Sequence, residues 1–489
     1  MHTNRSHALR RLAGLLGTTT AAIALSFAGS PGTADAAPVP TACTLYASPI
    51  GSDAGTGAAD RPFQSLPRLA AALTPGTVGC LRAGIYQLPS VPAARGGAVQ
   101  LLNLTKGGTP AAPAVLRNAP GADVRVVGRI VITPAAANLV IAGLTLDGGG
   151  TLNDEASSVT VLANNVALKG NTITAPTRIC VSIGAYGSSR VTVTGTVVEG
   201  NRIHHCGDDR AWGAVRTGYA HNQEHGVYVE GARGTIIQHN IIDHNDARGV
   251  QLFADADGTV VQNNIIDANT SGINIGGWAG AGFNYGRSEG NILRNNLITN
   301  SSRMAVEVNW DGVAAPTGSL TNLIDGNCVF GSNPNAVLGS TQGITWAAGN
   351  RWADPQYNNL SSGDYRLTAT SPCIGKGVMP TVQAVTPTAA TRTAITSTAV
   401  VSPHRMTAAY SLRVRLCSNA TCTGTFGAWS SSATATAVDV VDVRVSGSVG
   451  ALLPGRSYQA QWVVRQALLP AGSSGASTTS AAFVVTTKA

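Results

Sequence analysis

Hydrophobic and polar positions between residues 166 and 331 repeat a short template: two β-branched or aliphatic residues, two variable residues, an asparagine, and an aliphatic pair or near-pair. Six copies occur, and their asparagines are separated by 30, 39, 24, 32 and 31 residues. A strand-length apolar pattern that recurs at such intervals is typical of a parallel β-solenoid, in which each copy belongs to one turn and the loops vary in length. The shared asparagines are Asn171, Asn201, Asn240, Asn264, Asn296 and Asn327.

In a parallel solenoid each strand pairs with the equivalent strands of neighbouring turns, about 4.8 Å away along the axis. Aliphatic side chains at one template position then stack into a core, and the asparagines stack into a ladder. Asparagine also tolerates a left-handed backbone and can hydrogen-bond main-chain groups where the chain bends. We therefore interpret these asparagines as structural corner residues.

A second strand follows the template in successive turns, and its copies align as CVSIG, GVYVE, GVQLF, GINIG and AVEVN. Strand alternation places one set of residues inward and the other outward. The expected inward residues are Val227, Val229, Val250, Leu252, Ile273, Ile275, Val306 and Val308. The expected outward column is Ser182, Tyr228, Gln251, Asn274 and Glu307, with Gly184, Glu230, Phe253, Gly276 and Asn309 in a second column beside it.

Two long insertions, at residues 207–223 and 277–290, flank these strands and can form walls around the outward face. Polar, acidic and aromatic groups in a walled groove suit a sugar chain, since rings stack on the sugar and polar groups bond its hydroxyls. The expected substrate-binding residues are Tyr228, Gln251, Phe253, Asn274, Asn309 and Trp310.

Glu307 is the sharpest candidate for catalysis, because it projects from between two core valines. A glycoside hydrolase needs two carboxylates that flank the scissile bond. Glu230 lies three turns and one column away, which is about 14 Å or more at this turn spacing and exceeds the roughly 6.5–9.5 Å of an inverting pair. A pair of Glu307 with Asp311 stays open, and so does a solvated surface role for Glu307.

A lyase or epimerase that acts on uronate needs a base and a cation that stabilises the charge formed next to the carboxylate. His225 and Arg248 begin neighbouring strands and could supply these roles, with Glu230 nearby. A histidine bonded to loop backbone is the structural alternative for His225. If the protein is an enzyme, we favour a polysaccharide lyase over a hydrolase or an epimerase. The candidate catalytic residues are Glu307, His225, Arg248 and Glu230.

Two motifs resemble metal sites, and we assign no metal ligand to either. The segment HNQEH, residues 221–225, has the spacing of a zinc protease, but that spacing places both histidines on one face only in a helix. Here the segment leads into a strand. The segment DADGT, residues 255–259, begins like a calcium loop but lacks the glycine and glutamate that an EF-hand requires. We assign no cofactor, and a calcium ion bound by the solenoid is left open.

Residues 1–36 resemble a cleaved export signal, with early arginines, an apolar stretch and a small-residue cleavage site. No later stretch is long and apolar enough to span a bilayer. Eight cysteines agree with an oxidising destination, so we expect a secreted protein, extracellular or associated with the cell wall. Because neighbours in a coil favour local pairing, the expected disulfides are Cys43–Cys80, Cys180–Cys206, Cys328–Cys373 and Cys417–Cys422.

The net charge of +8 is unevenly distributed. Residues 37–383 hold 22 basic and 22 acidic side chains, whereas residues 384–489 hold eight basic and two acidic ones. The arginines are scattered rather than gathered into a dense stripe, so we expect no nucleic-acid partner. Attraction of the C-terminal region to an anionic envelope or polysaccharide is the better interpretation. We expect a monomer.

The N-terminal region resembles the secreted right-handed parallel β-helix proteins of the pectate-lyase-like superfamily. The resemblance rests on a tyrosine strand at Tyr46, the SPIGSD turn, the PFQSL helix start, the PGTV segment and Gly84 with Tyr86. It extends over about residues 43–377, whose last part is similar to the usual closing segment of such helices. It implies a fold but no particular reaction, since the superfamily includes lyases, hydrolases and epimerases.

The C-terminal segment LLPGRSYQAQWVVRQ, followed by SAAFVVTT, resembles the last strands of a fibronectin type III-like sandwich. The fold class is therefore all-β: a right-handed parallel β-helix (solenoid) with an N-terminal cap, followed by a small antiparallel β-sandwich. The expected parts are the signal (1–36), cap and first coil (37–100), β-helix (101–377), linker (378–383) and sandwich (384–489).

These observations predict a carbohydrate-active protein that binds and cleaves or modifies an extracellular polysaccharide, with uronate-containing polymers preferred. Lyase-type and hydrolase-type chemistry both remain open. The alternative is a non-catalytic, cell-wall-associated or adhesive β-solenoid.

Overall fold

The computed structural model describes residues 40, 42–92, 98–149, 157–174, 178–185, 191–207, 223–280, 283–332, 340–438, 441–467 and 477–489. The predicted signal, residues 1–36, lies outside this part of the chain. Pro38–Ala489 forms one compact unit. No helix among the described residues is long and apolar enough to span a membrane.

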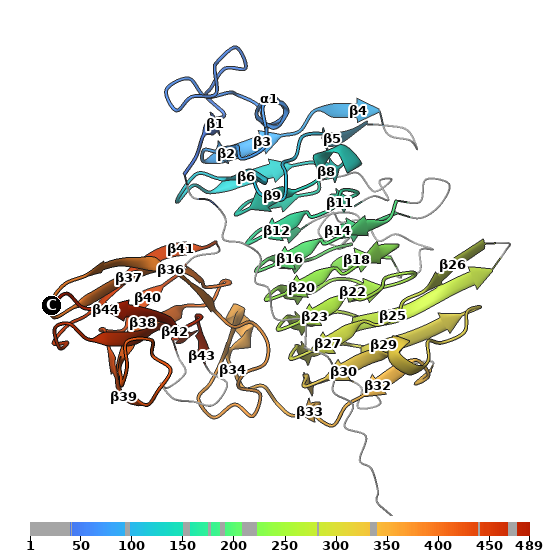
Figure 1. Ribbon diagram of the computed structural model, residues 1–489. Helices are drawn as coiled ribbons and strands as arrows, with labels where there is room; N and C mark the ends of the chain where they lie inside the picture. The colour runs from blue at the N-terminus through green and yellow to red at the C-terminus, as the bar shows by residue number, and fades with distance from the viewer. Residues whose placement is uncertain are drawn as a thin grey trace, which may run out of the picture. The chain divides into compact units, whose positions relative to one another are not determined.

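Three sheets built mainly of parallel strands form a β-helix (Figure 1). In the described chain, the first sheet contains β1 (Leu45–Ala47), β2 (Val78–Leu81), β6 (Ala114–Asn118), β9 (Leu139–Ala142), β12 (Ala167–Lys169), β16 (Val197–Glu199), β20 (Ile236–Gln238), β23 (Val260–Gln262), β27 (Ile292–Arg294), β30 (Asn322–Asp325) and β32 (Ile344–Trp346). The second contains β3 (Gly84–Gln87), β7 (Val124–Val127), β10 (Thr145–Asp147), β13 (Thr172–Thr174), β17 (Arg202–His204), β21 (Ile241–Asp243), β24 (Ile265–Asp267), β28 (Leu297–Thr299), β31 (Cys328–Phe330) and β33 (Arg351–Trp352).

The third sheet carries the groove predicted from the sequence. Its strands are β4 (Ser90–Pro92), β5 (Ala98–Leu104), β8 (Arg129–Ile132), β11 (Val159–Val161), β14 (Val181–Ile183), β18 (Val227–Val229), β22 (Arg248–Leu252), β25 (Ser271–Gly280), β26 (Phe283–Arg287) and β29 (Met304–Asp311). β25 and β26 form an antiparallel hairpin that extends beyond the parallel strands. A two-stranded sheet of β15 (Val193–Thr194) and β19 (Ala232–Arg233) lies apart from these three.

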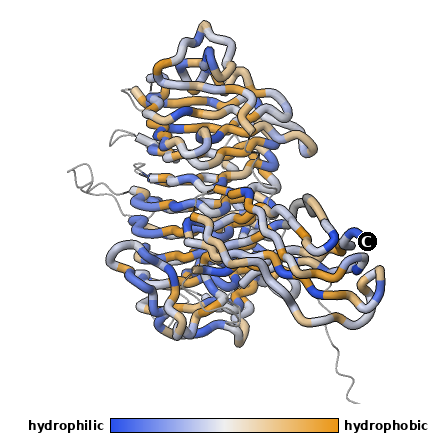
Figure 2. The backbone as a smooth tube through the Cα atoms, turned by 90° about the vertical axis from the view of Figure 1, so that its left-hand side faces the viewer, coloured by the Kyte–Doolittle hydropathy of each residue, from blue (hydrophilic) through white to orange (hydrophobic). Residues whose placement is uncertain are grey.

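The interior of the β-helix is a column of aliphatic side chains. Val227, Val250, Ile273 and Val306 are in register on four neighbouring strands, and each is 0% exposed. The other four residues expected to point inward have the same burial. Hydrophobic and hydrophilic stretches recur from turn to turn along the stack (Figure 2). The predicted inward set is therefore confirmed.

The six template asparagines form one buried ladder. Each side-chain amide nitrogen donates to the Oδ1 of the asparagine one turn on, as Asn240 does to Asn264 at 3.0 Å, and the last donates to Asn350. The same Oδ1 atoms also accept a hydrogen bond from the backbone N–H of the preceding ladder residue. The ladder thus connects successive corners of the first and second sheets.

The left-handed backbone lies one residue before each ladder asparagine, and not at the asparagine itself. The residues with positive φ are Gly170, Gly200, His239, Asn263, Asn295 and Gly326. Glycine and asparagine adopt this conformation most readily, which explains their frequency at this template position. The asparagine that follows has an ordinary backbone and supplies the side-chain hydrogen bonds.

The N-terminal turn is closed by the predicted short helix, α1 (Leu66–Ala71). Its Ser65 cap accepts a hydrogen bond from the Arg68 backbone N–H, and Asp53 of the predicted turn accepts from the Gln64 and Ser65 backbone. Leu66 and Leu69 pack into the β-helix core. A helix in this position covers apolar surface that an open solenoid end would expose.

After a β34–β35 hairpin (Tyr357–Asn359 and Asp364–Leu367), the chain forms two small antiparallel sheets. One contains β36 (Thr381–Ala390), β37 (Ile395–Ser402) and β41 (Val443–Val449). The other contains β38 (Ala408–Cys417), β39 (Phe426–Ser431), β40 (Ala435–Ala437), β42 (Ser457–Gln466), β43 (Ser477–Thr479) and β44 (Phe483–Thr486). The fibronectin type III assignment and the part boundaries stay predictions.

Four disulfides join Cys43–Cys80, Cys180–Cys206, Cys328–Cys373 and Cys417–Cys422, the pairs predicted from the sequence. Each joins residues that are close in sequence, between 5 and 45 positions apart. This set of bonds fits an extracellular protein, since disulfides persist in oxidising compartments.

The asparagine ladder makes a measurable contribution to stability. Asn264→Ala would leave the backbone N–H and the amide of Asn240 without their common acceptor, in a place that water does not reach. Because each unsatisfied buried group costs about 1–3 kcal/mol, we expect a loss of about 3 kcal/mol in urea unfolding. The control Asn359→Ala removes an exposed side chain whose Oδ1 accepts a hydrogen bond from Ser361, and we expect it to cost under about 0.5 kcal/mol. Equal losses in both variants would contradict a structural ladder.

Candidate functional site

A cavity of about 540 Å³ lies on the outward face of the third sheet. It is formed by β14, β18, β22 and β25, by the segments that lead into these strands, and by the β25–β26 hairpin. This is the face that the sequence predicted as a groove. Its described wall consists of Ser157, Arg178, Ile179, Ser182, Gln223, His225, Tyr228, Glu230, Arg248, Gln251, Phe253, Ala254, Asn274, Trp278, Tyr285 and Asn309.

The floor of the cavity is the predicted outward column. Ser182 is paired with Tyr228, Tyr228 with Gln251, and Gln251 with Asn274, on four consecutive strands. Parallel pairing in register sets these side chains about 4.8 Å apart. The cavity therefore presents one polar group per turn along the axis of the solenoid.

Aromatic rings form the wall at the hairpin. Trp278 of β25 stacks on Tyr285 of β26, with ring centroids 5.0 Å apart. Phe253 lies over Gly276, where a Cβ atom would come within 2.6 Å of the phenyl ring. The glycine thus makes room for the ring on the strand surface. Flat apolar faces beside polar groups are the usual composition of a sugar-binding cleft.

Glu230 is the titratable carboxyl of this wall. Burial raises its pKa to about 7, against the opposing effects of hydrogen bonds from Ser182 and Tyr228 and of the nearby charge of Arg178. Its Oε1 lies 3.3 Å from the Ser182 hydroxyl. A carboxyl with this pKa changes charge near neutral pH, which suits a group that takes up and returns a proton.

His225 is 1% exposed and precedes β18 at the bottom of the cavity. Burial, followed by the charges of Arg248 and Arg178, holds its pKa well below the ordinary value, so the ring is neutral. Its Nδ1 has no hydrogen-bond partner among the described residues, and neither has Oε1 of the buried Gln251. Both residues line the cavity, and a ligand hydroxyl could satisfy these acceptors.

Arg248 is fixed by Glu307 through two hydrogen bonds. Its Nε and Nη2 atoms donate to the two carboxylate oxygens at 3.2 and 3.0 Å, and Arg303 approaches the same carboxylate at 3.5 Å. Such a bidentate pair orients the guanidinium group firmly. Arg248 is 9% exposed and lines the cavity, so a rigid positive charge is presented to it.

The position of Glu307 differs from the one expected for a catalytic acid. It belongs to the outward column, but it is 3% exposed, is bound to two arginines and does not line the cavity. Trp310 lines a separate hollow of about 400 Å³ and donates to the Gln342 carbonyl. The other predicted site residues meet at one cavity: His225, Arg248, Glu230, Tyr228, Gln251, Phe253, Asn274 and Asn309.

Sequence reasoning missed Arg178, Trp278 and Tyr285. Arg178 precedes β14 much as Arg248 begins β22, so the rule that selected Arg248 could have found it. The two rings lie in the insertion that was predicted as a wall, and its aromatic content was the available signal. The other insertion, residues 207–223, lies outside the described residues except for its two ends.

The described residues bring together no group of three His, Cys, Asp or Glu side chains that could hold a metal ion. In the calcium-like segment, Asp255 and Asp257 both contact Arg233, at 2.8 and 3.3 Å. Their charges are therefore matched by an arginine of β19, on the neighbouring coil. In the zinc-like segment, His221 is outside the described residues and His225 leads into a strand.

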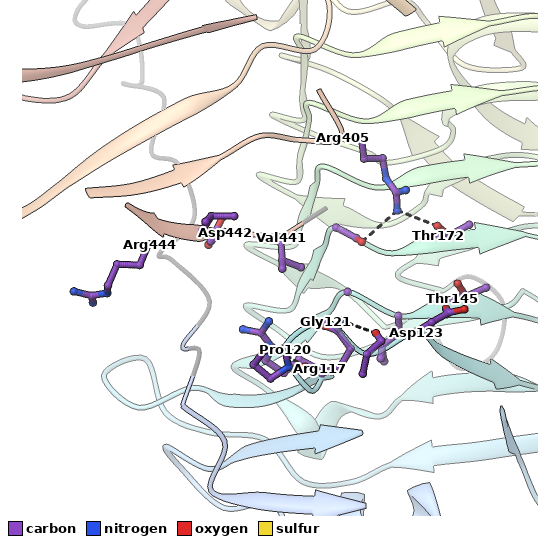
Figure 3. A pocket seen from close by; sticks show the side chains of 16 residues that line it. Arg117, Pro120, Gly121, Asp123, Thr145, Thr172, Arg405, Val441, Asp442 and Arg444 are labelled. Atoms are coloured by element: carbon purple, nitrogen blue, oxygen red, sulfur yellow. Dashed lines mark hydrogen bonds between the residues drawn. The ribbon is translucent and has the colours of Figure 1, made fainter. Parts of the chain in front are cut away.

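A second cavity of about 540 Å³ lies at the corner between the first and second sheets, beside residues 441–444 (Figure 3). Its polar groups serve contacts within the protein. Arg405 donates to the Gly170 carbonyl and to Thr172, and Asp442 contacts Lys169 at 3.7 Å. None of the predicted site residues lies in this cavity.

Comparison with known proteins gives a match between residues 142–351 and the family described as "Right handed beta helix region". The three-sheet solenoid is accordingly right-handed. No curated protein matches the sequence. Among solved structures, pectate lyase Pel9A is similar with 13% identity and a TM-score of 0.47, over 69% of this chain and 92% of that one.

Two further structures are similar at the same level. A rhamnogalacturonan lyase has 13% identity and a TM-score of 0.41, over 68% of this chain and 94% of its own. An alginate lyase from Paenibacillus sp. str. FPU-7 has 16% identity and a TM-score of 0.40, over 58% and 92%. At these identities the matches concern the fold and assign no reaction to this chain.

The raised pKa of Glu230 predicts a pH-dependent cost to stability. An unfolded glutamate ionises near pH 4.5 and the folded one near pH 7, so the wild type loses stability as the pH rises between these values. Glu230→Gln removes this titration. From pH 4 to pH 8 we expect the variant to gain up to about 3 kcal/mol relative to the wild type in urea unfolding. A difference that does not vary with pH would contradict the raised pKa.

Proposed function

We propose that this protein acts on an acidic extracellular polysaccharide, and that it removes a proton next to a sugar carboxylate as a lyase does. The cavity on the third sheet is the proposed active site. One observation carries the proposal: its described wall combines one carboxyl that titrates near neutral pH, Glu230, with two arginines, Arg178 and Arg248. This is the set of groups that proton abstraction from a uronate requires.

In the proposed reaction the arginines bind the sugar carboxylate and stabilise the negative charge that forms on it. The ionised Glu230 removes the proton on the adjacent carbon, and the electron pair of that C–H bond forms the new C=C bond. The bond from the neighbouring carbon to the glycosidic oxygen breaks, and this oxygen leaves with a proton donated by the Tyr228 hydroxyl. The phenolate then recovers a proton from Glu230, either directly or through water, because the two side chains are hydrogen-bonded.

Hydrolysis by paired carboxylates has less support. Such an enzyme needs an acid and a second, ionised carboxylate across the scissile bond. Glu230 is the one acidic residue along the described wall, and the carboxylate of Glu307 is bound to Arg248 and Arg303. Epimerisation begins with the same proton removal, so it must be distinguished from elimination by its products.

The reaction class can be tested with the full chain and a panel of uronate-containing and neutral polysaccharides. We expect new ultraviolet absorbance from the unsaturated product on a uronate polymer, with activity that rises with pH through about 7 as Glu230 ionises. Glu230→Gln should lower kcat by a factor of about 100 or more. Reducing ends without ultraviolet absorbance would indicate hydrolysis instead, and an altered sugar configuration without cleavage would indicate an epimerase. Binding without products would favour the non-catalytic, adhesive solenoid.

Glu307 is expected to act by positioning Arg248. Glu307→Gln would break the bidentate pair, so we expect KM for the acidic polymer to rise about tenfold, with a smaller change in kcat. The pH at half-maximal activity should stay where Glu230 sets it. The matched control is Asp311→Asn, which removes a carboxylate from an exposed position on the same strand. A shifted pH profile in Glu307→Gln would identify Glu307 itself as the titrating group.

A further inference from the structure

The outer face of the β38–β39–β42 sheet carries arginines interleaved with aromatic rings. The Arg415 guanidinium lies 3.7 Å from the centroid of the Phe426 ring and 4.6 Å from that of Trp429. At the other end of the row, the Arg413 guanidinium lies 4.3 Å from the centroid of the Trp429 ring. The four side chains thus form one continuous stack of flat groups, far in sequence from the cavity on the β-helix.

Strand alternation builds this face. Leu412 and Val414 point into the sandwich core and are 0% exposed, so Arg413 and Arg415, which alternate with them, point out. On β42 their paired residues are Gln461 and Gln459.

These glutamines hold the arginines in place. Gln461 accepts two hydrogen bonds from Arg413, and Gln459 accepts one from Nε of Arg415 at 2.8 Å. The stack is therefore ordered before any ligand arrives. Little conformational entropy would be lost on binding.

The positive charge of this face is not compensated. β38, β39 and β42 contain no Asp or Glu, and neither arginine forms an ion pair within the described part of the chain. The Nη atoms of Arg415 make no hydrogen bond to a described residue. Burial and the charge of Arg415 lower the pKa of Arg413, which indicates two cations held close together. An anion bound between them would relieve this repulsion.

We propose that this face is a second binding site, for an acidic polysaccharide. Free guanidinium N–H groups match the geometry of carboxylate or sulfate oxygens, and the Phe426 and Trp429 rings offer flat surfaces to sugar rings. The site goes beyond the proposed catalytic function and does not require it. It also gives a role to two of the eight basic residues that accompany two acidic ones between 384 and 489.

A single-stranded nucleic acid also stacks on aromatic rings and contacts arginine. The polysaccharide is favoured because the row offers two cations and no longer basic track that would follow a phosphate backbone. The four disulfides also fit an extracellular location, where acidic polysaccharides are the abundant polyanions.

Affinity measurements on the full chain test the site. All variants carry Glu230→Gln as well, so that the polymers are not cleaved. The probes are polygalacturonate, dextran sulfate, neutral dextran and oligothymidylate, in calorimetric or affinity-electrophoresis titrations. We expect binding to one or both acidic polysaccharides, and the comparison of these two distinguishes carboxylate from sulfate recognition. Dextran and oligothymidylate should bind at least tenfold more weakly.

Variants then separate this face from the cavity. Arg415→Ala and Trp429→Ala should each weaken binding to the preferred acidic polymer by tenfold or more, with an unchanged melting temperature. Arg415→Lys keeps the charge but not the flat guanidinium, and should give an intermediate loss. The control Arg444→Ala removes an equal charge from an exposed position on β41 of the other sheet, and should change affinity less than twofold.

Three results would overturn the proposal. The first is a loss in Arg444→Ala equal to that in Arg415→Ala, which would mean that only net charge matters. The second is tighter binding of oligothymidylate, which would assign the face to nucleic acid. The third is no binding of either acidic polymer. Failure of the catalytic proposal would leave all of these measurements intact, because they need no turnover.

Discussion

The buried asparagine ladder is the interaction on which the rest of the structure depends. At each corner a polar side chain lies where no water reaches it, and its hydrogen bonds are complete only if the next turn places an asparagine at the same position. A slip of one residue in any turn would leave donors and acceptors unpaired and would also move the core residues to the surface. Register is thereby specified twice, by apolar stacking and by hydrogen bonding.

Fixed register also creates the candidate site. The side chains of the cavity come from turns that are far apart in sequence, and Arg248 and Glu307 are 59 positions apart. They meet because each strand repeats the alternation of its neighbour. The result is a row of outward groups on a stiff backbone, with Glu230, the arginines and the aromatic wall supplied by different turns.

The repeating features could be predicted from the sequence, because the asparagine template occurs six times and the second strand five times. The parallel solenoid and the inward residues follow from this periodicity, and the cysteine pairs follow from proximity along the chain. The left-handed position was assigned one residue too late, since either of two adjacent residues could form the corner and only backbone geometry distinguishes them. Features that occur only once in the sequence could not be predicted in this way. The pairing of Glu307 with Arg248 depends on whether their side chains reach each other across two strand gaps, which spacing alone does not determine. Arg178 and the Trp278–Tyr285 stack depend on how loops fold back over the sheet, and loops have no period.

The shortest turn of the β-helix shows how few residues the scaffold itself requires. Between Asn240 and Asn264 the chain completes a full circuit, with a strand in each of the three sheets, in 24 residues. Every longer turn therefore contains residues that the core does not need, and in the turn from Asn264 to Asn296 they form the β25–β26 hairpin that borders the cavity. Insertions and deletions at such edges could accumulate at little energetic cost, so one rigid frame can be fitted to ligands of different shape during evolution or by grafting new loops.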